Sequence, residues 1–142
     1  MKAFSVSTII AASAEKIWNI LTDAPNWTRW NTTVEKIVGE IAVGQKVSVF
    51  VKVNPKRAFP VRVTQFVPNK KMVWTGGMPF GLFKGERTYT LTEQPNGSTE
   101  FAMREEFTGL MAPLITRSIP DLQPVFQEFA AALKQHAEQP KQ

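Results

Sequence analysis

Apolar and polar residues alternate along much of the chain, and this period of two is typical of strands with one buried face. The alternation begins at residues 4 to 10 and returns in about six segments between 32 and 109, which are separated by turn residues. Short turns and no crossover helices join these segments, so the six should form an antiparallel meander. In the segment at 59 to 67, Val67 continues the apolar face of Val63, and Pro60 suggests an edge strand or a bulge.

The apolar start of the chain also resembles a secretory signal peptide. Lys2 precedes the apolar stretch, and the string Ala12-Ser13-Ala14 follows it in the manner of a cleavage site. Serine and threonine, however, interrupt the stretch at alternate positions, and this period of two is typical of a strand and not of the apolar core of a signal peptide. We therefore interpret it as the first strand of the sheet.

Two regions have the apolar spacing of helices. Between 13 and 30 two short helices are expected, of which the first begins after Ser13 as N-cap and ends before Pro25. Near the end of the chain, a short helix at 113 to 118 should precede a main helix from about Asp121 to His136. The apolar stripe of the main helix consists of Leu122, Val125, Phe126, Phe129, Ala130 and Leu133. Such a stripe lies on an apolar surface, and the sheet is the surface available.

The string Gln94-Pro95-Asn96-Gly97 fixes the register of the last two strands. Pro suits the second position of a type I turn and Gly suits the left-handed residue after it, which predicts a three-residue loop. Counting outward from this loop places Arg87 opposite Glu105. Cross-strand partners share a face. The face that holds the pair also carries Phe83, Tyr89, Leu91, Phe101, Met103 and Phe107.

The predicted Arg87–Glu105 pair allows two interpretations. A lone charge on an apolar face is costly, so the two side chains should form an ion pair, yet such pairs rarely gain stability over apolar residues of like volume. One interpretation is functional: the pair orients a polar group of an apolar ligand in a cavity between the sheet and the main helix. The other is a half-exposed structural ion pair near a sheet end.

Length and composition narrow the class of protein. The 142 residues are 43% hydrophobic and 20% charged, which fits one folded domain over 1–138 and a tail at 139–142. The chain has no Cys and a single His, His136. Thiolate metal sites and cysteine nucleophiles are therefore excluded, and a zinc site or a serine triad would depend on that one His. We expect no metal and no cofactor, and no apolar run reaches the ~18 residues of a transmembrane helix.

The net charge is +5, and the excess of basic residues is concentrated between Glu40 and Glu86, where no acidic residue occurs. The basic residues there are Lys46, Lys52, Lys56, Arg57, Arg62, Lys70, Lys71 and Lys84. They fit either solvated outer positions of strands or a basic face for a membrane surface or another anionic partner. No RNP, zinc-finger or helix-turn-helix pattern accompanies them, so we expect no nucleic-acid partner.

Several strings, in this order of elements, resemble the START-related (SRPBCC) superfamily. They are Ala14-Glu15-Lys16-Ile17-Trp18, Trp27-x-x-Trp30-Asn31, Gly85-x-Arg87-x-Tyr89-x-Leu91, Glu105-x-Phe107-x-Gly109-Leu110 and Leu133-Lys134. The superfamily includes pollen-allergen-like ligand carriers, aromatase/cyclases of polyketide synthesis, and small bacterial proteins of the polyketide cyclase/dehydrase and lipid transport type. The resemblance implies an α+β helix-grip fold over 1–138. In that fold a curved antiparallel sheet of about seven strands wraps around the C-terminal helix and an apolar cavity.

One departure from the small bacterial relatives bears on catalysis. These relatives often carry His where Arg87 stands, and another polar residue near Met103. A His can move protons near neutral pH, whereas Arg stays charged and can only bind or stabilise an anion. The departure disfavours acid–base catalysis and leaves ligand binding untouched.

The leading hypothesis is a cytoplasmic carrier or sensor, monomeric or homodimeric, without enzymatic activity. Its ligand would be a small hydrophobic molecule of lipid, sterol, polyketide or aromatic type, and an anionic group on it would meet Arg87. The predicted ligand-binding residues are Val49, Val51, Val61, Val63, Trp74, Phe83, Arg87, Tyr89, Phe101, Met103, Glu105, Phe107, Phe126 and Phe129. The direction of Trp74 depends on the length of the turn at Pro68-Asn69, which the sequence leaves open.

Three segments are expected to gate the cavity, at 54–57, 76–81 and 113–120. An alternative function is that of a polyketide cyclase or dehydratase, with Glu105 as general base and Tyr89 or Arg87 stabilising an enolate. The ion pair with Arg87 makes Glu105 a weaker base, which counts against this alternative. A second alternative is a membrane-surface or protein interaction module, supported by the basic stretch at 46–84.

Overall fold

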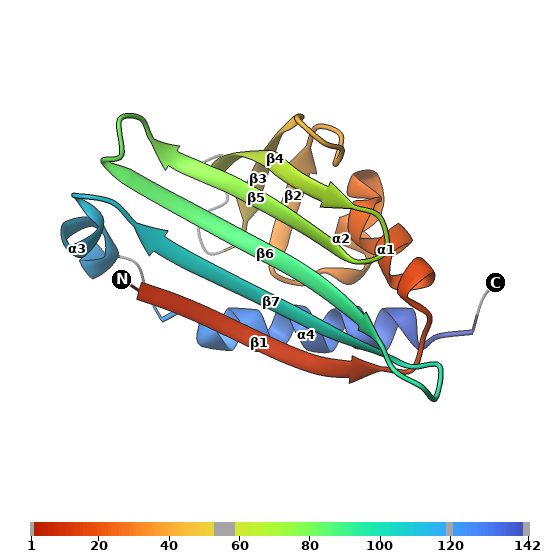
Figure 1. Ribbon diagram of the computed structural model, residues 1–142. Helices are drawn as coiled ribbons and strands as arrows, with labels where there is room; N and C mark the ends of the chain where they lie inside the picture. Colours follow the sequence, from red (N-terminus) through yellow and green to blue (C-terminus); the bar gives the residue numbers. More distant parts are fainter. Residues whose placement is uncertain (1, 53–58, 119–120, 141–142) are drawn as a thin grey trace.

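The computed structural model describes residues 2–52, 59–118 and 121–140, and its main feature is a curved antiparallel sheet around the C-terminal helix (Figure 1). The strands are β1 Lys2–Ile10, β2 Val34–Val38, β3 Lys46–Val51, β4 Phe59–Val67, β5 Lys71–Met78, β6 Phe83–Glu93 and β7 Thr99–Thr108. Their order in the sheet is β1-β7-β6-β5-β4-β3-β2. Six consecutive strands therefore form a meander and β1 closes it beside β7, as predicted.

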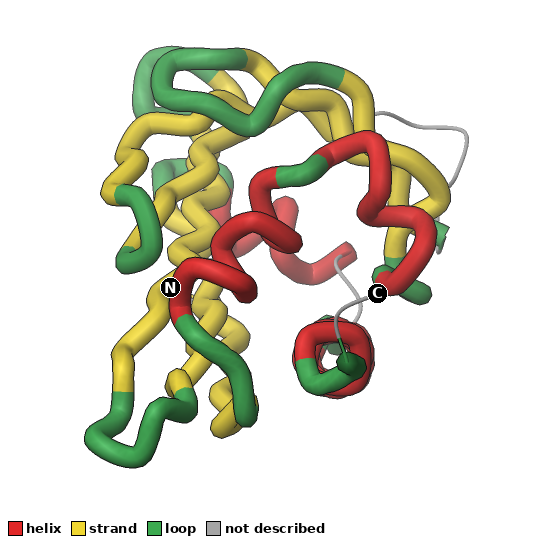
Figure 2. Tube along the Cα trace, turned by 90° about the vertical axis from the view of Figure 1, so that its right-hand side faces the viewer, coloured by secondary structure: helices red, strands yellow, loops and turns green. Residues whose placement is uncertain are grey.

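The helices lie on the concave side of the sheet and at one end of it. They are α1 Ala14–Thr22, η1 Ala24–Asn26, α2 Trp27–Trp30, α3 Ala112–Ile115, η2 Thr116–Ser118 and α4 Gln123–Ala137, of which η1 and η2 are 3₁₀ turns. Figure 2 looks along α4 and shows the sheet curving around it. In the described part of the chain, no helix combines the length and the apolar character needed to span a membrane.

The ends of the helices follow the predicted signals with one difference. The Ser13 hydroxyl accepts a hydrogen bond from the Lys16 backbone N–H at 3.1 Å and so caps α1. The main helix, however, begins at Gln123, two residues after the predicted Asp121. The Asp121 carboxylate accepts the Gln123 backbone N–H at 3.0 Å, which holds the segment just before the helix. Pro124 then occupies the first turn of α4, where a missing N–H costs no hydrogen bond.

A bulge in β4 corrects one predicted position. The register of β4 against β5 shifts between Val63 and Gln65. Val63 is buried, but beyond the bulge it is Phe66 that packs on the core, with its ring centroid 5.2 Å from that of Trp18. Val67 is 46% exposed, so its assignment to the apolar face was wrong because the extra residue reverses the alternation.

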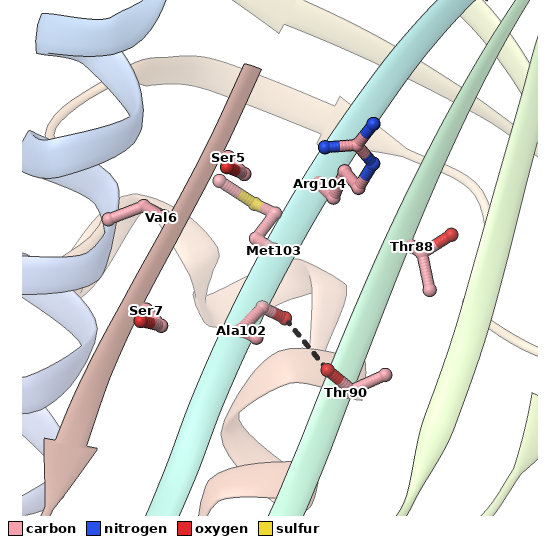
Figure 3. Close-up of a pocket in the computed structure, with 8 residues that line it drawn as sticks. All are labelled: Ser5, Val6, Ser7, Thr88, Thr90, Ala102, Met103 and Arg104. Atoms are coloured by element: carbon pink, nitrogen blue, oxygen red, sulfur yellow. Dashed lines mark hydrogen bonds between the residues drawn. The ribbon is translucent and has the colours of Figure 1, made fainter. Parts of the chain in front are cut away.

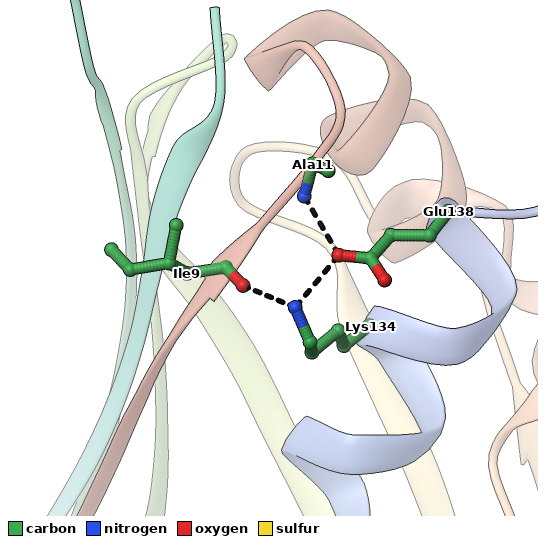
Figure 4. A network of polar contacts seen from close by, with 4 residues as sticks. All are labelled: Ile9, Ala11, Lys134 and Glu138. Atoms are coloured by element: carbon green, nitrogen blue, oxygen red, sulfur yellow. Dashed lines mark hydrogen bonds and ion pairs between the residues drawn. The ribbon is translucent and has the colours of Figure 1, made fainter. Parts of the chain in front are cut away.

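Side chains of α4 cover the free edge of β1 (Figure 4). Lys134 Nζ donates to the Ile9 carbonyl at 2.6 Å, and the Ala11 backbone N–H donates to Glu138 Oε2 at 2.8 Å. Lys134 and Glu138 also pair with each other at 2.7 Å, one helical turn apart. We call these four residues the clasp. It satisfies backbone groups that an edge strand would otherwise offer to another chain.

Candidate functional site

Arg87 and Glu105 lie opposite each other on β6 and β7, as the turn predicted. The turn has the expected three-residue loop: the Gln94 N–H donates to the Ser98 carbonyl at 2.9 Å, and Gly97 has a φ of +87°. Arg87 Nε and Nη2 each lie 2.7 Å from Glu105 Oε1. The predicted register and the predicted ion pair are therefore both confirmed.

The pair sits where the apolar core meets solvent. The Arg87 side chain is 28% exposed and that of Glu105 is 16% exposed. From α4, Phe126 covers the guanidinium, whose carbon is 5.0 Å from the ring centroid, and this contact is a cation–π interaction. On β5, Trp74 is the cross-strand partner of Arg87. The guanidinium thus has apolar surface around it and an approach from solvent.

The charges at the site are fixed by their surroundings. Burial is the largest single influence and lowers the pKa of Arg87, but the interactions with Glu105 and then with Tyr89 together outweigh burial, so the pKa is raised. Arg87 is therefore a permanent cation that can hold an anion and cannot exchange protons. Burial raises the pKa of the Tyr89 hydroxyl, while the charge of Arg87 acts in the opposite direction. This hydroxyl is buried, neutral at ordinary pH, and without a hydrogen-bond partner among the described residues.

The deeper part of the concave side is filled by aromatic rings. Trp74 stacks on Trp27 with centroids 5.5 Å apart and planes at 19°, and it contacts Tyr89 at 5.0 Å. The ring of Phe129 lies 5.7 Å from Trp27 and 6.1 Å from Phe101. Trp74 therefore points into the core, which settles the direction that the sequence left open.

Neither of two hollows on the described surface lies between the sheet and α4, where the cavity was predicted. One of them, about 530 Å³, lies on the convex face of β1, β7 and β6 (Figure 3). It exists because small side chains, including Ser5, Ser7 and Ala102, leave a depression beside Arg104. The other lies beside the Gln94–Ser98 turn. Aromatic side chains occupy the deeper part of the space between the sheet and α4, and the cavity stays a prediction.

The predicted ligand-binding residues divide into two groups. The buried group consists of Val63, Trp74, Tyr89, Phe101, Met103, Phe107, Phe126 and Phe129. The partly exposed group consists of Val49, Val51, Val61, Phe83, Arg87 and Glu105. Strand register places the second group toward one end of the concave face, where β6 begins and β7 ends. We call this the open end, and a ligand could reach it without displacing the aromatic core.

Gly85 shapes the floor of the open end. A Cβ at Gly85 would lie 3.4 Å from the ring of Phe107, in ordinary van der Waals contact, so this ring packs beside the backbone of Gly85. Phe107 then stacks on Phe83 with centroids 5.8 Å apart and planes at 13°. The two rings form an apolar platform next to the Glu105 carboxylate. A flat apolar surface therefore lies beside the charged pair.

Two aromatic residues of the concave side were missed in the sequence. Trp27 and Trp30 are both buried, and their ring centroids lie 5.5 Å apart on one side of α2. Their separation of three residues could have indicated this, since such positions share a helix face.

Of the predicted gates, 54–57 lies outside the described residues. The gate at 76–81 is the end of β5 and its turn. Of the gate at 113–120, residues 113–118 lie in α3 and η2, and 119–120 lie outside the described residues.

Comparisons with known proteins agree with this architecture. The family described as polyketide cyclase / dehydrase and lipid transport matches residues 1–138. No curated protein matches the chain at a significant level.

Solved structures with little sequence identity share the fold. A START superfamily protein from Mycobacterium smegmatis is 18% identical, with a TM-score of 0.70 over 96% of this chain and 97% of that one. The Aha1 dimer from Colwellia psychrerythraea is 22% identical, with a TM-score of 0.74 over 100% of both chains. The di-domain ARO/CYC StfQ from the steffimycin biosynthetic pathway is 18% identical, with a TM-score of 0.70 over 96% of this chain and 50% of that one. The curved sheet around α4 is the helix-grip fold, and the chain belongs to the polyketide cyclase/dehydrase and lipid transport family.

Proposed function

We propose that the protein binds a small hydrophobic molecule at the open end and that Arg87 holds an anionic group of this molecule. The family and the fold support a hydrophobic ligand. The observation that carries the proposal is the place of Arg87, a permanent cation on an apolar face that is still 28% exposed. A residue with no role beyond folding would be replaced there by an apolar one at little cost.

The guanidinium has donors to spare for a ligand. Both of its contacts with Glu105 end on a single oxygen, Oε1. Arg carries five N–H donors in a planar fork, so an incoming carboxylate or phenolate can bind while the ion pair stays intact. The Phe83–Phe107 platform lies beside the pair and offers apolar surface to the rest of the molecule. The ligand is thus placed over the platform and outside the filled core.

Two measurements test the proposal. Native mass spectrometry of the purified full chain should show a bound hydrophobic molecule. In titrations by fluorescence, cis-parinaric acid should bind more tightly than its methyl ester, which lacks the charge. The change Arg87→Gln should weaken the acid about tenfold or more, because a hydrogen bond to a charged group is worth about 1.5 to 3 kcal/mol, and should leave the ester within about twofold.

Arg104→Gln is the matched control for this test. Arg104 also pairs with a glutamate, Glu106, at 2.8 Å, but on the convex face. Its replacement should change neither affinity. Equal binding of acid and ester by the native chain would remove the role of Arg87 as an anion site. Failure to bind either probe, with nothing bound in the purified protein, would remove the ligand-binding function.

The family relationship supports a second candidate function. In this alternative the protein is a cyclase or dehydratase and Glu105 is the general base. Against it, Glu105 Oε1 already accepts two contacts from Arg87, so the guanidinium occupies an oxygen that a base would need for the substrate proton. Glu105→Gln separates the two functions. A binding protein should retain its probe affinity within a few-fold, whereas an enzyme should lose nearly all turnover of a polyketide substrate.

A further inference from the structure

Three apolar side chains at the open end are almost bare to solvent. Phe80 is 93% exposed, Leu110 is 83% exposed and Leu114 is 61% exposed. Phe80 is in the turn between β5 and β6, whereas Leu110 and Leu114 are in the segment from β7 into α3. Single exposed apolar residues are common, but neighbouring ones mark a contact surface. We call these three residues the rim.

The two rim segments form one structure. The Leu110 N–H donates to the Gly81 carbonyl at 3.2 Å, and the Met111 N–H donates to the Leu82 carbonyl at 2.8 Å. Figure 1 shows the β5–β6 turn and α3 at the same end of the sheet. The rim therefore has a fixed shape and borders the end of the concave face where Arg87 is accessible.

Phe80 is unfavourable in its turn as well as in water. Its φ is +61° and that of Gly81 is +70°, and the Leu82 N–H donates to the Pro79 carbonyl at 3.3 Å. These values describe a type I′ turn, which favours Asn-Gly because both central residues need positive φ. A bulky Phe is strained in this region. The Phe80 ring improves neither the stability of the turn nor the solubility of the protein. We therefore infer that the ring contacts a partner.

The charge around the rim indicates the kind of partner. The segments 78–84 and 108–118 contain Lys84 and Arg117 and no acidic residue, in a protein with a net charge of +5. Lys84 is paired with Glu86 at 3.3 Å, on exposed side chains where such pairs are weak. Two copies of the chain joined through the rim would bring these cations together. An anionic surface with an apolar interior satisfies both the cations and the rings.

We propose that the rim docks on the surface of an anionic lipid bilayer, with Phe80, Leu110 and Leu114 inserted and Lys84 and Arg117 at the headgroups. Docking would place the open end against the membrane, so that a hydrophobic ligand could pass between the lipid and the protein without crossing water. The docking itself needs no ligand and does not depend on the role of Arg87.

Vesicle co-sedimentation of the full chain tests the docking. Vesicles of phosphatidylcholine with about 30% phosphatidylserine should bind the native chain more strongly than vesicles of phosphatidylcholine alone. Added salt should weaken the binding. Phe80→Asn should lower the partition coefficient about tenfold on both membranes, because a buried ring is lost. Arg117→Gln should lower it roughly fivefold on the anionic membrane only.

The variants are chosen so that unfolding cannot explain a loss. Asn tolerates positive φ, so the urea midpoint of Phe80→Asn should equal or exceed that of the native chain. Val43→Ser is the matched control, since Val43 is 63% exposed in the loop between β2 and β3 and should not affect docking. Phe80→Asn should also bind cis-parinaric acid in solution like the native chain, which separates docking from the proposed function.

Three outcomes would overturn the proposal. The first is no binding of the native chain to the anionic vesicles. The second is an equal effect of Phe80→Asn and Val43→Ser on partition. The third is a dimer in sedimentation velocity that dissociates on Phe80→Asn, because the rim would then be a self-association surface.

Discussion

At the scale of the residue, variants of Arg87 and Glu105 can show whether the ion pair contributes to stability or is kept for ligand binding. Glu105→Gln keeps the shape and leaves Arg87 without a charged partner on a partly apolar face. We expect a loss of about 1 to 3 kcal/mol in the free energy of unfolding, less than for a fully buried pair because the Arg87 side chain is 28% exposed. The double change Arg87→Met with Glu105→Leu should lie within about 1 kcal/mol of the native chain.

Urea unfolding of the single and double variants checks this expectation. If the double variant loses as much free energy of unfolding as the single variant, the pair is present for stability, and its retention is no argument for a ligand.

The pair itself could be predicted because a Pro-Asn-Gly turn fixes the register by local chemistry alone. The exposure of Phe80 could not be predicted in the same way. An apolar residue beside Pro and Gly is as compatible with a covered turn as with a bare one.

At the scale of the element, the clasp attaches α4 to β1 through Glu138. The hydrogen bond from the Ala11 backbone N–H, followed by that from Lys134, lowers the pKa of Glu138 from its usual value of 4.5. A carboxyl group with a lowered pKa in the folded state stabilises that state above the unfolded pKa, and the contribution is lost as the pH falls through the folded value. The native chain should therefore exceed Glu138→Gln in urea midpoint at pH 7, and the difference should shrink as the pH falls below the usual pKa and vanish below the lowered one.

Glu93→Gln serves as the control for the clasp, because Glu93 is exposed at the end of β6 and is not a clasp residue. A difference in urea midpoint between the native chain and Glu138→Gln that persists unchanged into acid would show that the clasp does not depend on the carboxylate charge.

Element order and strand register followed from turn residues and alternation in the sequence. The place of the β4 bulge did not, because Pro60 lies before the shift between Val63 and Gln65, no Gly marks the shift, and Val67 continues the alternation that the backbone breaks.

At the scale of the whole molecule, sequence pattern identifies which residues face inward but not whether they meet. The concave face and α4 carry the aromatic side chains that were predicted, and the rings of Trp74, Tyr89 and Phe129 turn out to lie against one another. Whether such rings enclose a space depends on their summed volume and on the curvature of the sheet, which hydrophobic periodicity does not encode. The separation into a filled core and an open end is therefore a property of the assembled fold.

This separation predicts that stability and ligand binding respond to different residues. Leu133→Ala in the filled core should cost about 2 to 5 kcal/mol in the free energy of unfolding, because a fully buried side chain leaves a cavity, and should leave the affinity for cis-parinaric acid within about twofold while the chain is folded. Phe83→Ala at the open end removes a partly exposed ring of the platform, so it should cost less stability and weaken the probe several-fold. Urea unfolding and fluorescence titration of both variants measure the two effects. The reverse result, with the probe sensitive to Leu133 and indifferent to Phe83, would mean that the ligand enters the aromatic core and that α4 moves to admit it.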